Sequence, residues 1–334
     1  MKVSIGGRAR TAAICMVTVS AGLLMGEQPA VAALDKNSTI STVAGTGLPG
    51  LSGDGGPATQ AQLDRPRDAD VGPDGSIYIA DTFNHAIRRI TPDGTITTFA
   101  GTGVAGYGGD NGPATSAMLT WPHDVSVDQV TGKVYIADGL NVAIRVVDLS
   151  SGIITRLAGT GVAGFSGDGG PATQAMLNVP QRIAIGPRGG VYVADSLNNR
   201  IRKISVNGVI NTIAGTGVAG FSGDGGDALL AQIKGPKGIV VNPYASVVYF
   251  SDSENNRVRQ IDMRTGVITT IAGKARKGFT GDGGPSGVAL LSNPRGLALD
   301  PWGRLLVADK GNSAIRVISP AEPPPVEPPP EPGS

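Results

Sequence analysis

The sequence contains few of the side chains that enzymes most often use for catalysis. Its 334 residues include one cysteine, two histidines and 4% aromatic residues. Cys15 lies in a segment that we expect to be removed, which leaves no disulfide and no thiolate metal ligand. His85 and His123 belong to different copies of a repeat, and a histidine-bound metal would need more imidazoles. The sequence shows neither a Ser–His–Asp nor a Cys–His order, so it gives no indication of the common nucleophilic triads.

Long helices and an excess of one charge are missing as well. No segment carries an apolar 3.6-residue period long enough for a helix of ordinary length. The 28 basic and 27 acidic residues nearly cancel. Removal of residues 1–32 takes away three basic residues and one acidic residue, which leaves 25 against 26. A nucleic-acid surface needs a clustered basic excess, so we expect no nucleic-acid partner.

Both ends of the chain differ in composition from the rest. Three basic residues precede an apolar stretch at residues 11–25, and Ala30-Val31-Ala32 offers a cleavage site. This pattern predicts a secretory signal peptide at residues 1–32, a short leader at 33–39 and no membrane span in the mature chain. Residues 319–334 include eight prolines and predict an extended tail or linker. We therefore expect a secreted or envelope-associated protein.

An aspartate and an arginine recur in five copies at a constant spacing of 57 residues. The aspartates are Asp81, Asp138, Asp195, Asp252 and Asp309, and the arginines are Arg88, Arg145, Arg202, Arg259 and Arg316. A fixed period of this kind indicates one supersecondary unit that is repeated and stacked.

Each copy contains four short runs rich in Val, Ile, Tyr and Thr and bounded by Gly, Asn and Asp, which predict strands. Four antiparallel strands per repeat are typical of a propeller blade. The sequence therefore predicts an all-β, five-bladed propeller over residues 40–318. Residues 40–45 have the pattern of a fourth strand, but the first three strands of that blade do not precede them. Residues 315–318 have the pattern of a third strand that no fourth strand follows. Pairing of these two segments would close the propeller and leave no open sheet edge.

The segment from Val191 to Lys203 resembles the motif of NHL-repeat propellers, and Asn84-His85-Ala86-Ile87-Arg88 is similar to it. The loop Gly164–Ala172 resembles the longer form in bacterial secreted NHL proteins and in the NHL region of teneurins. The resemblance covers about residues 40–318. It implies a propeller, although NHL propellers usually have six blades with shorter repeats. The family includes protein and RNA binders, sensor domains of bacterial membrane kinases and some lyases, so the fold alone does not select a function.

The repeated Asp and Arg pairs are expected to be structural, because an Asp after a strand caps the next turn and an Arg seven residues later can bridge back. The glycine-rich loops each carry one aspartate and should share one face of the propeller. These are Asp54, Asp110, Asp168, Asp224 and Asp282. A Ca²⁺ site is the alternative interpretation, but one carboxylate per loop falls short of six to eight oxygens. We expect no cofactor.

Differences between the copies are the best indication of a site. First strands line the channel of a propeller, and the positions after the proline that opens each one vary between copies. The residues that depart from the repeat are Asp68, Asp70, His123, Asp124 and Arg182. Carboxylates beside His and Arg could form a polar binding pocket with shifted pKa values at the channel mouth. A hydrated channel with a local Asp–Arg ion pair is the simpler alternative.

Two functions remain open from the sequence. The favoured one is a secreted, monomeric and non-catalytic scaffold whose loop-rich face engages a protein or a glycan at the bacterial envelope. The other is a propeller lyase or hydrolase in which Asp68, His123, Asp124 and Arg182 act at the channel mouth.

Overall fold

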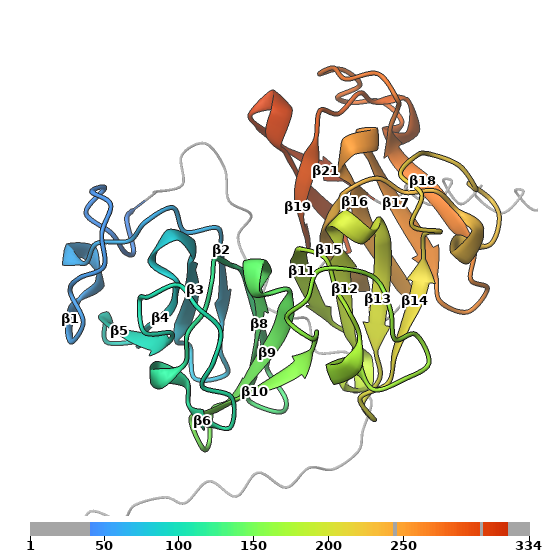
Figure 1. The fold of residues 1–334 in the computed structure, drawn as a ribbon. Helices are drawn as coiled ribbons and strands as arrows, with labels where there is room; N and C mark the ends of the chain where they lie inside the picture. Colours follow the sequence, from blue (N-terminus) through green and yellow to red (C-terminus); the bar gives the residue numbers. More distant parts are fainter. Residues whose placement is uncertain (1–40, 243–245, 301–302, 320–334) are drawn as a thin grey trace, which may run out of the picture. The chain divides into compact units, whose positions relative to one another are not determined.

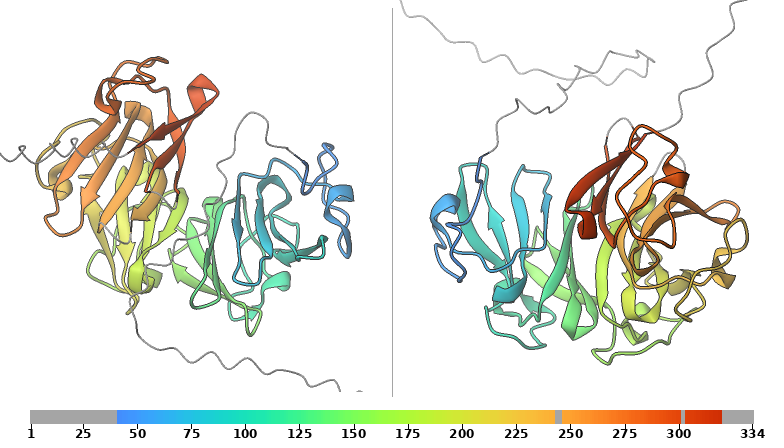
Figure 2. Two further views of the ribbon diagram at one scale, coloured as in Figure 1. Left: turned by 180° about the vertical axis from the view of Figure 1, so that it is seen from behind. Right: turned by 90° about the horizontal axis from the view of Figure 1, so that it is seen from above.

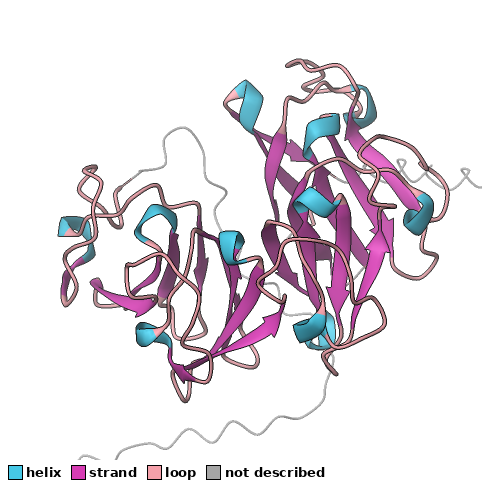
Figure 3. Cartoon of the chain, viewed as in Figure 1, coloured by secondary structure: helices cyan, strands magenta, loops and turns pink. Residues whose placement is uncertain are grey.

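Five small antiparallel sheets follow one another along the chain (Figure 1). The computed structural model describes residues 41–242, 246–300 and 303–319. The expected signal peptide, leader and nearly all of the proline-rich tail lie outside the described residues. Within them, strands and loops alternate with short 3-10 helices (Figure 3). The prediction of an all-β, five-bladed propeller is confirmed.

Each of the first four sheets has four main strands that pair in chain order. They are β2 (Asp68–Val71), β3 (Ile77–Asp81), β4 (Ala86–Ile90) and β5 (Thr95–Ala100) in blade one; β7 (Pro122–Asp128), β8 (Lys133–Asp138), β9 (Ala143–Asp148) and β10 (Ile153–Ala158) in blade two; β11 (Pro180–Ile185), β12 (Val191–Asp195), β13 (Arg200–Ile204) and β14 (Ile210–Ala214) in blade three; and β15 (Pro236–Asn242), β16 (Val247–Asp252), β17 (Arg257–Asp262) and β18 (Ile268–Gly273) in blade four. Blade five has β19 (Pro294–Leu299), β20 (Leu305–Asp309) and β21 (Ala314–Ile318).

The prediction of four strands in every blade is wrong in detail, because the described sheets have between three and five. In blades one and two, a fifth strand of two residues lies at the outer edge. These strands are β1 (Gly56–Pro57), which pairs with β5, and β6 (Gly112–Pro113), which pairs with β10. The same glycine-rich segment makes only a single bridge in blades three and four. The extra strands are therefore loop ends that touch the outer strand.

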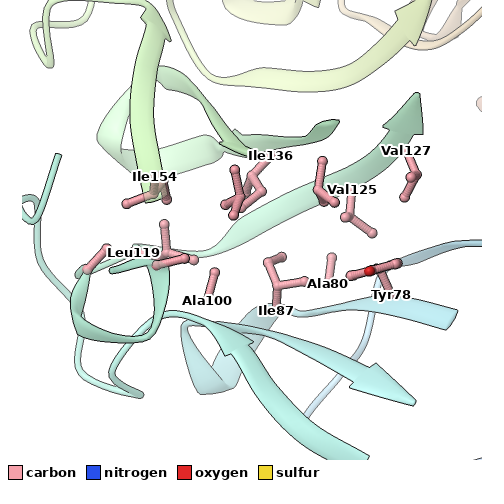
Figure 4. Close-up of a cluster of buried hydrophobic side chains, with 13 residues drawn as sticks. Tyr78, Ala80, Ile87, Ala100, Leu119, Val125, Val127, Ile136 and Ile154 are labelled. Atoms are coloured by element: carbon pink, nitrogen blue, oxygen red, sulfur yellow. The ribbon is translucent and has the colours of Figure 1, made fainter. Parts of the chain in front are cut away.

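The first strands of consecutive blades contact one another in the order β2, β7, β11, β15, β19. Consecutive blades also share hydrophobic clusters, as expected for stacked repeats that cannot bury an apolar face alone. Figure 4 shows one of them, in which Tyr78 and Ile87 of blade one meet Val125 and Ile136 of blade two. Equivalent clusters join blades two and three, three and four, and four and five. The core thus lies between the sheets (Figure 2).

Closure of the propeller stays a prediction. In the described part of the chain, β21 forms a ladder with β20 alone, and Ile315 and Val317 on β21 are 69% and 54% exposed. Nevertheless, the N–H of Gly45 donates to the carbonyl of Ala58 at 3.0 Å. Gly215, which follows the fourth strand of blade three, makes the equivalent bond to Ala228 at 2.9 Å. Relative to the loop that follows it, Gly45 therefore occupies the position equivalent to Gly215.

Candidate functional site

Every blade contains an arginine held between two aspartates, which is fully buried in the first four blades and 10% exposed in the fifth. In blade three, the Arg202 side chain is fully buried and lies 3.4 Å from Asp195 and 2.8 Å from Asp168 of the glycine-rich loop. The equivalent ion pairs involve Arg88 with Asp81 and Asp54, Arg145 with Asp138 and Asp110, Arg259 with Asp252 and Asp224, and Arg316 with Asp309 and Asp282. The contact to the loop aspartate is the shorter one in every blade, so the arginine ties the loop to the sheet.

The strand aspartate of each network is saturated with hydrogen bonds. Asp195 accepts from the backbone N–H of Asn178 at 2.7 Å and from the side-chain amide of Asn198 at 2.8 Å. Burial nevertheless raises the pKa of Asp138, Asp195 and Asp252 to about 6, although these bonds and the arginines oppose the shift. The same arrangement in every blade is typical of a structural element rather than a ligand site.

The aromatic residues of the loops lie against arginines. The Phe165 ring lies 3.5 Å from the guanidinium carbon of Arg200 and 4.9 Å from that of Arg202. Phe221 has the same arrangement with Arg257 and Arg259. Cation–π attraction thus fixes the loops further. The loop carboxylates considered as Ca²⁺ ligands are engaged by arginine, and the described residues contain no cluster of three or more His, Cys, Asp or Glu suited to a metal ion.

The structure brings together three of the residues that depart from the repeat. Arg182 on β11 contacts Asp68 at the start of β2, and its Nε lies 3.5 Å from Asp124 on β7. Asp124 also accepts the backbone N–H of Ile183 at 2.9 Å. Asp70 accepts the N–H of Val127 at 2.8 Å and bridges blades one and two. This is the local Asp–Arg network that the sequence offered as the simpler alternative, and it joins three blades.

The two carboxyls of this network affect each other. Burial raises the pKa of Asp68 to about 9, with the Asp124 charge adding to the effect and Arg182 opposing it. Burial also raises the pKa of Asp124. One proton between the two carboxyls at neutral pH would balance their charge against the single guanidinium, because two close carboxylates resist ionising together.

His123 lies apart from this network. It is 6% exposed, and its Nδ1 lies 3.4 Å from the carbonyl of Pro180 and 3.2 Å from Nε2 of Gln181. Gly139 makes room for it, because a Cβ there would lie 2.3 Å from the imidazole. Burial and the charges of Arg67 and Arg295 together lower the His123 pKa to about 4, with burial the largest cause and the bond to the Pro180 carbonyl opposing the shift. His123 is therefore neutral at physiological pH.

We expect the His123 imidazole resonance to titrate near pH 4 in an NMR experiment. The folded pKa lies below the unfolded value of about 6.5, so its contribution to stability is present above pH 6.5 and is lost as pH falls towards 4. His123→Gln should flatten the pH dependence of the unfolding free energy in this window. A midpoint at or above pH 6 would contradict the description of a buried neutral ring.

A cavity of about 530 Å³ opens beside His123. Each blade contributes the residue that directly follows its repeated proline: Arg67, His123, Gln181, Lys237 and Arg295. Arg182 and Lys310 also line it, whereas Asp68 and Asp124 do not. Of the lining residues, Arg67, Gln181, Lys237, Arg295 and Lys310 were not predicted from the sequence. The signal that could have found them was a cation after the proline in three of five copies.

This cavity and the starts of the glycine-rich loops lie at one end of the blades. In blade four, Pro236 at the start of the first strand pairs with Asp252 at the end of the second. The fourth strand ends at this same end, and the Asn198 side chain, in the turn after the second strand of blade three, donates to the carbonyl of Gly164 at the start of a loop at 2.7 Å. The loop starts, the cavity residues and the turns after the second strands therefore lie together, while the later part of each loop reaches the opposite end, where the N–H of Ala172 donates to the carbonyl of Gly208. Lys310 comes from such a turn, η11 (Lys310–Asn312).

Family models agree with this architecture. The model of the teneurin NHL domain matches residues 161–220, and the NHL repeat model matches residues 291–318. The chain belongs to the NHL-repeat β-propeller family.

Among curated relatives of this NHL protein, SUPPRESSOR OF QUENCHING 1 of Arabidopsis thaliana is 34% identical over 72% of the chain. Teneurin-1 of Gallus gallus is 30% identical over 68%, and NHL repeat-containing protein 2 of Gallus gallus is 27% identical over 72%. The chain spans 24%, 9% and 37% of the lengths of these three proteins.

Solved structures share the fold at low identity. Two auxiliary nutrient binding proteins, from Bacteroides thetaiotaomicron and Bacteroides ovatus, are 16% and 18% identical, with TM-scores of 0.55 and 0.56. The matches cover 78% and 79% of this chain and 60% and 61% of those chains. Across the described residues, we find no helix with the length and apolar character needed to cross a bilayer.

Proposed function

We propose that this NHL propeller is a secreted, non-catalytic binding scaffold of the bacterial envelope, whose loop-rich face engages a protein or a glycan. The observation that carries the proposal is the cavity to which all five blades contribute on the loop-rich face. Loops from every blade can contact a ligand that is bound in such a cavity. The two structurally similar nutrient binding proteins are compatible with a binding role.

Exposed aliphatic residues on the same face support a macromolecular partner. They follow the Thr-Gly pair after the fourth strand in four repeats and are 59–64% exposed. They are Leu48, Val104, Val162 and Val218. Aliphatic side chains repeated around a polar cavity offer contact area that a partner would desolvate.

The geometry argues against the alternative of a lyase or hydrolase. A general acid must reach the proton acceptor within hydrogen-bond distance. Asp68 and Asp124 have raised pKa values, but Arg182 contacts both, and neither lines the cavity. Turnover of a small substrate that is lost in Asp68→Asn or Asp124→Asn would favour the enzymatic alternative.

We expect Val162→Asp with Val218→Asp to weaken partner binding at least about tenfold, since a buried charge without a counterion opposes association. Binding would be measured by glycan microarray and by titration with purified envelope proteins. Val206→Asp is the matched control, because Val206 is 69% exposed in the turn between β13 and β14 at the opposite end of the blade. Equal loss in the control would refute use of the loop-rich face.

A further inference from the structure

The cavity on the loop-rich face collects positive charge. Among its lining residues, Arg67, Arg182, Lys237, Arg295 and Lys310 are cationic, and no aspartate or glutamate accompanies them. Arg182 is neutralised by Asp68 and Asp124. Within the described residues, the other four cations form no salt bridge within 4.0 Å. Glu254 approaches Lys237 closely enough to affect its pKa but does not line the cavity.

These cations repel one another at a partly dehydrated position. Burial lowers the pKa of Arg67, and the charge of Arg295 lowers it further. Burial also lowers the Lys237 pKa, with Arg295 and Lys310 adding to the shift and Glu254 opposing it. Grouping like charges in this way costs free energy in the unliganded protein. Such a cost is typical of sites where the opposite charge belongs to a ligand.

The Arg295 side chain has a buried donor without an acceptor, as the structural arginines Arg88, Arg145 and Arg202 do. The Nε–H of Arg295 is inaccessible to solvent and has no hydrogen-bond partner in the described part of the chain. Buried polar groups are nearly always paired, and an unpaired one is costly. The backbone position of Arg295 is fixed, because its carbonyl accepts the Ser251 hydroxyl at 2.8 Å and passes so close to Gly238 that no Cβ would fit there.

The remaining walls limit the size and character of the ligand. Neutral His123 and Gln181 form a polar wall, while Ala308, Ala314 and Ile315 provide an apolar one. A volume of about 530 Å³ lies within the range of small-molecule sites. Guanidinium groups bind carboxylates and phosphates through paired, charge-assisted hydrogen bonds. Four cations that form no salt bridge with the described residues suit a ligand with several negative charges better than a monoanion.

We propose that this cavity binds a small organic anion, or an anionic group of a larger partner, that carries at least two carboxylate or phosphate groups. The proposal rests on the binding role assigned above to the loop-rich face and names the chemistry that this face recognises. Arg67, Lys237, Arg295 and Lys310 hold the oxyanions, and the aliphatic wall contacts the carbon skeleton.

Isothermal titration of the full chain with citrate and with inorganic pyrophosphate tests the proposal, at ionic strengths of about 20 and 150 mM. We expect at least one probe to bind, and we expect the double variant Lys237→Gln, Arg295→Gln to bind it at least about tenfold more weakly, because two charged hydrogen-bonding groups are lost. The matched control is Lys133→Gln with Arg264→Gln, which removes the same charge at the opposite end of the blades and should stay within about twofold of wild type. Binding of citrate alone indicates a polycarboxylate, and binding of pyrophosphate alone indicates a phosphorylated ligand.

The anion site is refuted if neither probe binds at low ionic strength, or if the two double variants lose affinity equally. Thermal unfolding of each variant verifies that it is folded. The outcome is separable from that of the loop-rich face: Val162→Asp with Val218→Asp should leave citrate or pyrophosphate binding unchanged. A protein that binds its partner through these valines but ignores both anions would retain the scaffold function and lose only the anion site.

Discussion

Asp195→Ala is expected to lower the free energy of unfolding by about 3–5 kcal/mol, the range found when one partner of a buried ion pair is removed. The substitution leaves the fully buried guanidinium of Arg202 with the partly exposed Asp168 as its remaining salt-bridge partner in the described structure. It also removes the acceptor for the backbone N–H of Asn178. Both effects act on the point where the glycine-rich loop joins the blade. Urea denaturation followed by circular dichroism would measure the loss.

Asp262→Ala is the matched control for this experiment. Asp262 pairs with Arg264, whose side chain is 72% exposed. Exposed ion pairs contribute little, so the control, which also loses the acceptor for the N–H of Arg264 in its turn, should lower the stability far less than Asp195→Ala. Limited proteolysis would locate the effect, since Asp195→Ala should open the loop near Gly164–Ala172 before the rest of blade three. Equal urea midpoints for the two variants would show that the buried network does not stabilise the blade.

Ser41→Cys combined with Val317→Cys is expected to form a disulfide that raises the free energy of unfolding by about 5–6 kcal/mol in the chain-entropy model. In blade three, Lys203 pairs with Asn211. The equivalent positions in the last blade are Val317 and Ser41, so closure of the propeller would place them opposite each other. The bond would close a loop of 276 residues, and long loops gain most from a cross-link in the chain-entropy model.

Mass spectrometry of the oxidised protein and thermal unfolding with and without reductant would measure the outcome. Cys15 would be replaced by serine to exclude mispairing. Lys203→Cys with Asn211→Cys serves as the positive control, because these residues are already paired. Absence of the cross-link in the test pair, together with its formation in the control, would show that residues 41–45 do not complete the last blade.

The repeat could be predicted from the sequence because its signals are local. The apolar runs and the glycine-rich turns lie within one copy of the motif, the spacing of Asp195 and Asp252 marks the repeat, and similar copies fold alike. The number of blades and the all-β class follow directly from these signals. The strand count differed in the structure because loop ends such as Gly56–Pro57 pair with an outer strand.

The candidate site was predicted only in part, because the residues after the repeated proline do not follow strand alternation. In blades two to five, the pairing register shifts there, for instance between Pro180 and Ile183. Such a bulge re-aims side chains. Arg182 therefore contacts the carboxylates, while Gln181 reaches His123.

By itself, the sequence determined that this protein is an NHL-type propeller of five repeats, since period, polarity and turn chemistry act over short distances. Only the tertiary structure decided which charges meet. Arg182 and Asp68 are 114 residues apart, and Arg67 and Arg295 line one cavity from the first and last blades. Contacts of this kind depend on how the blades stack and on where each first strand bulges, and neither is encoded within a single repeat.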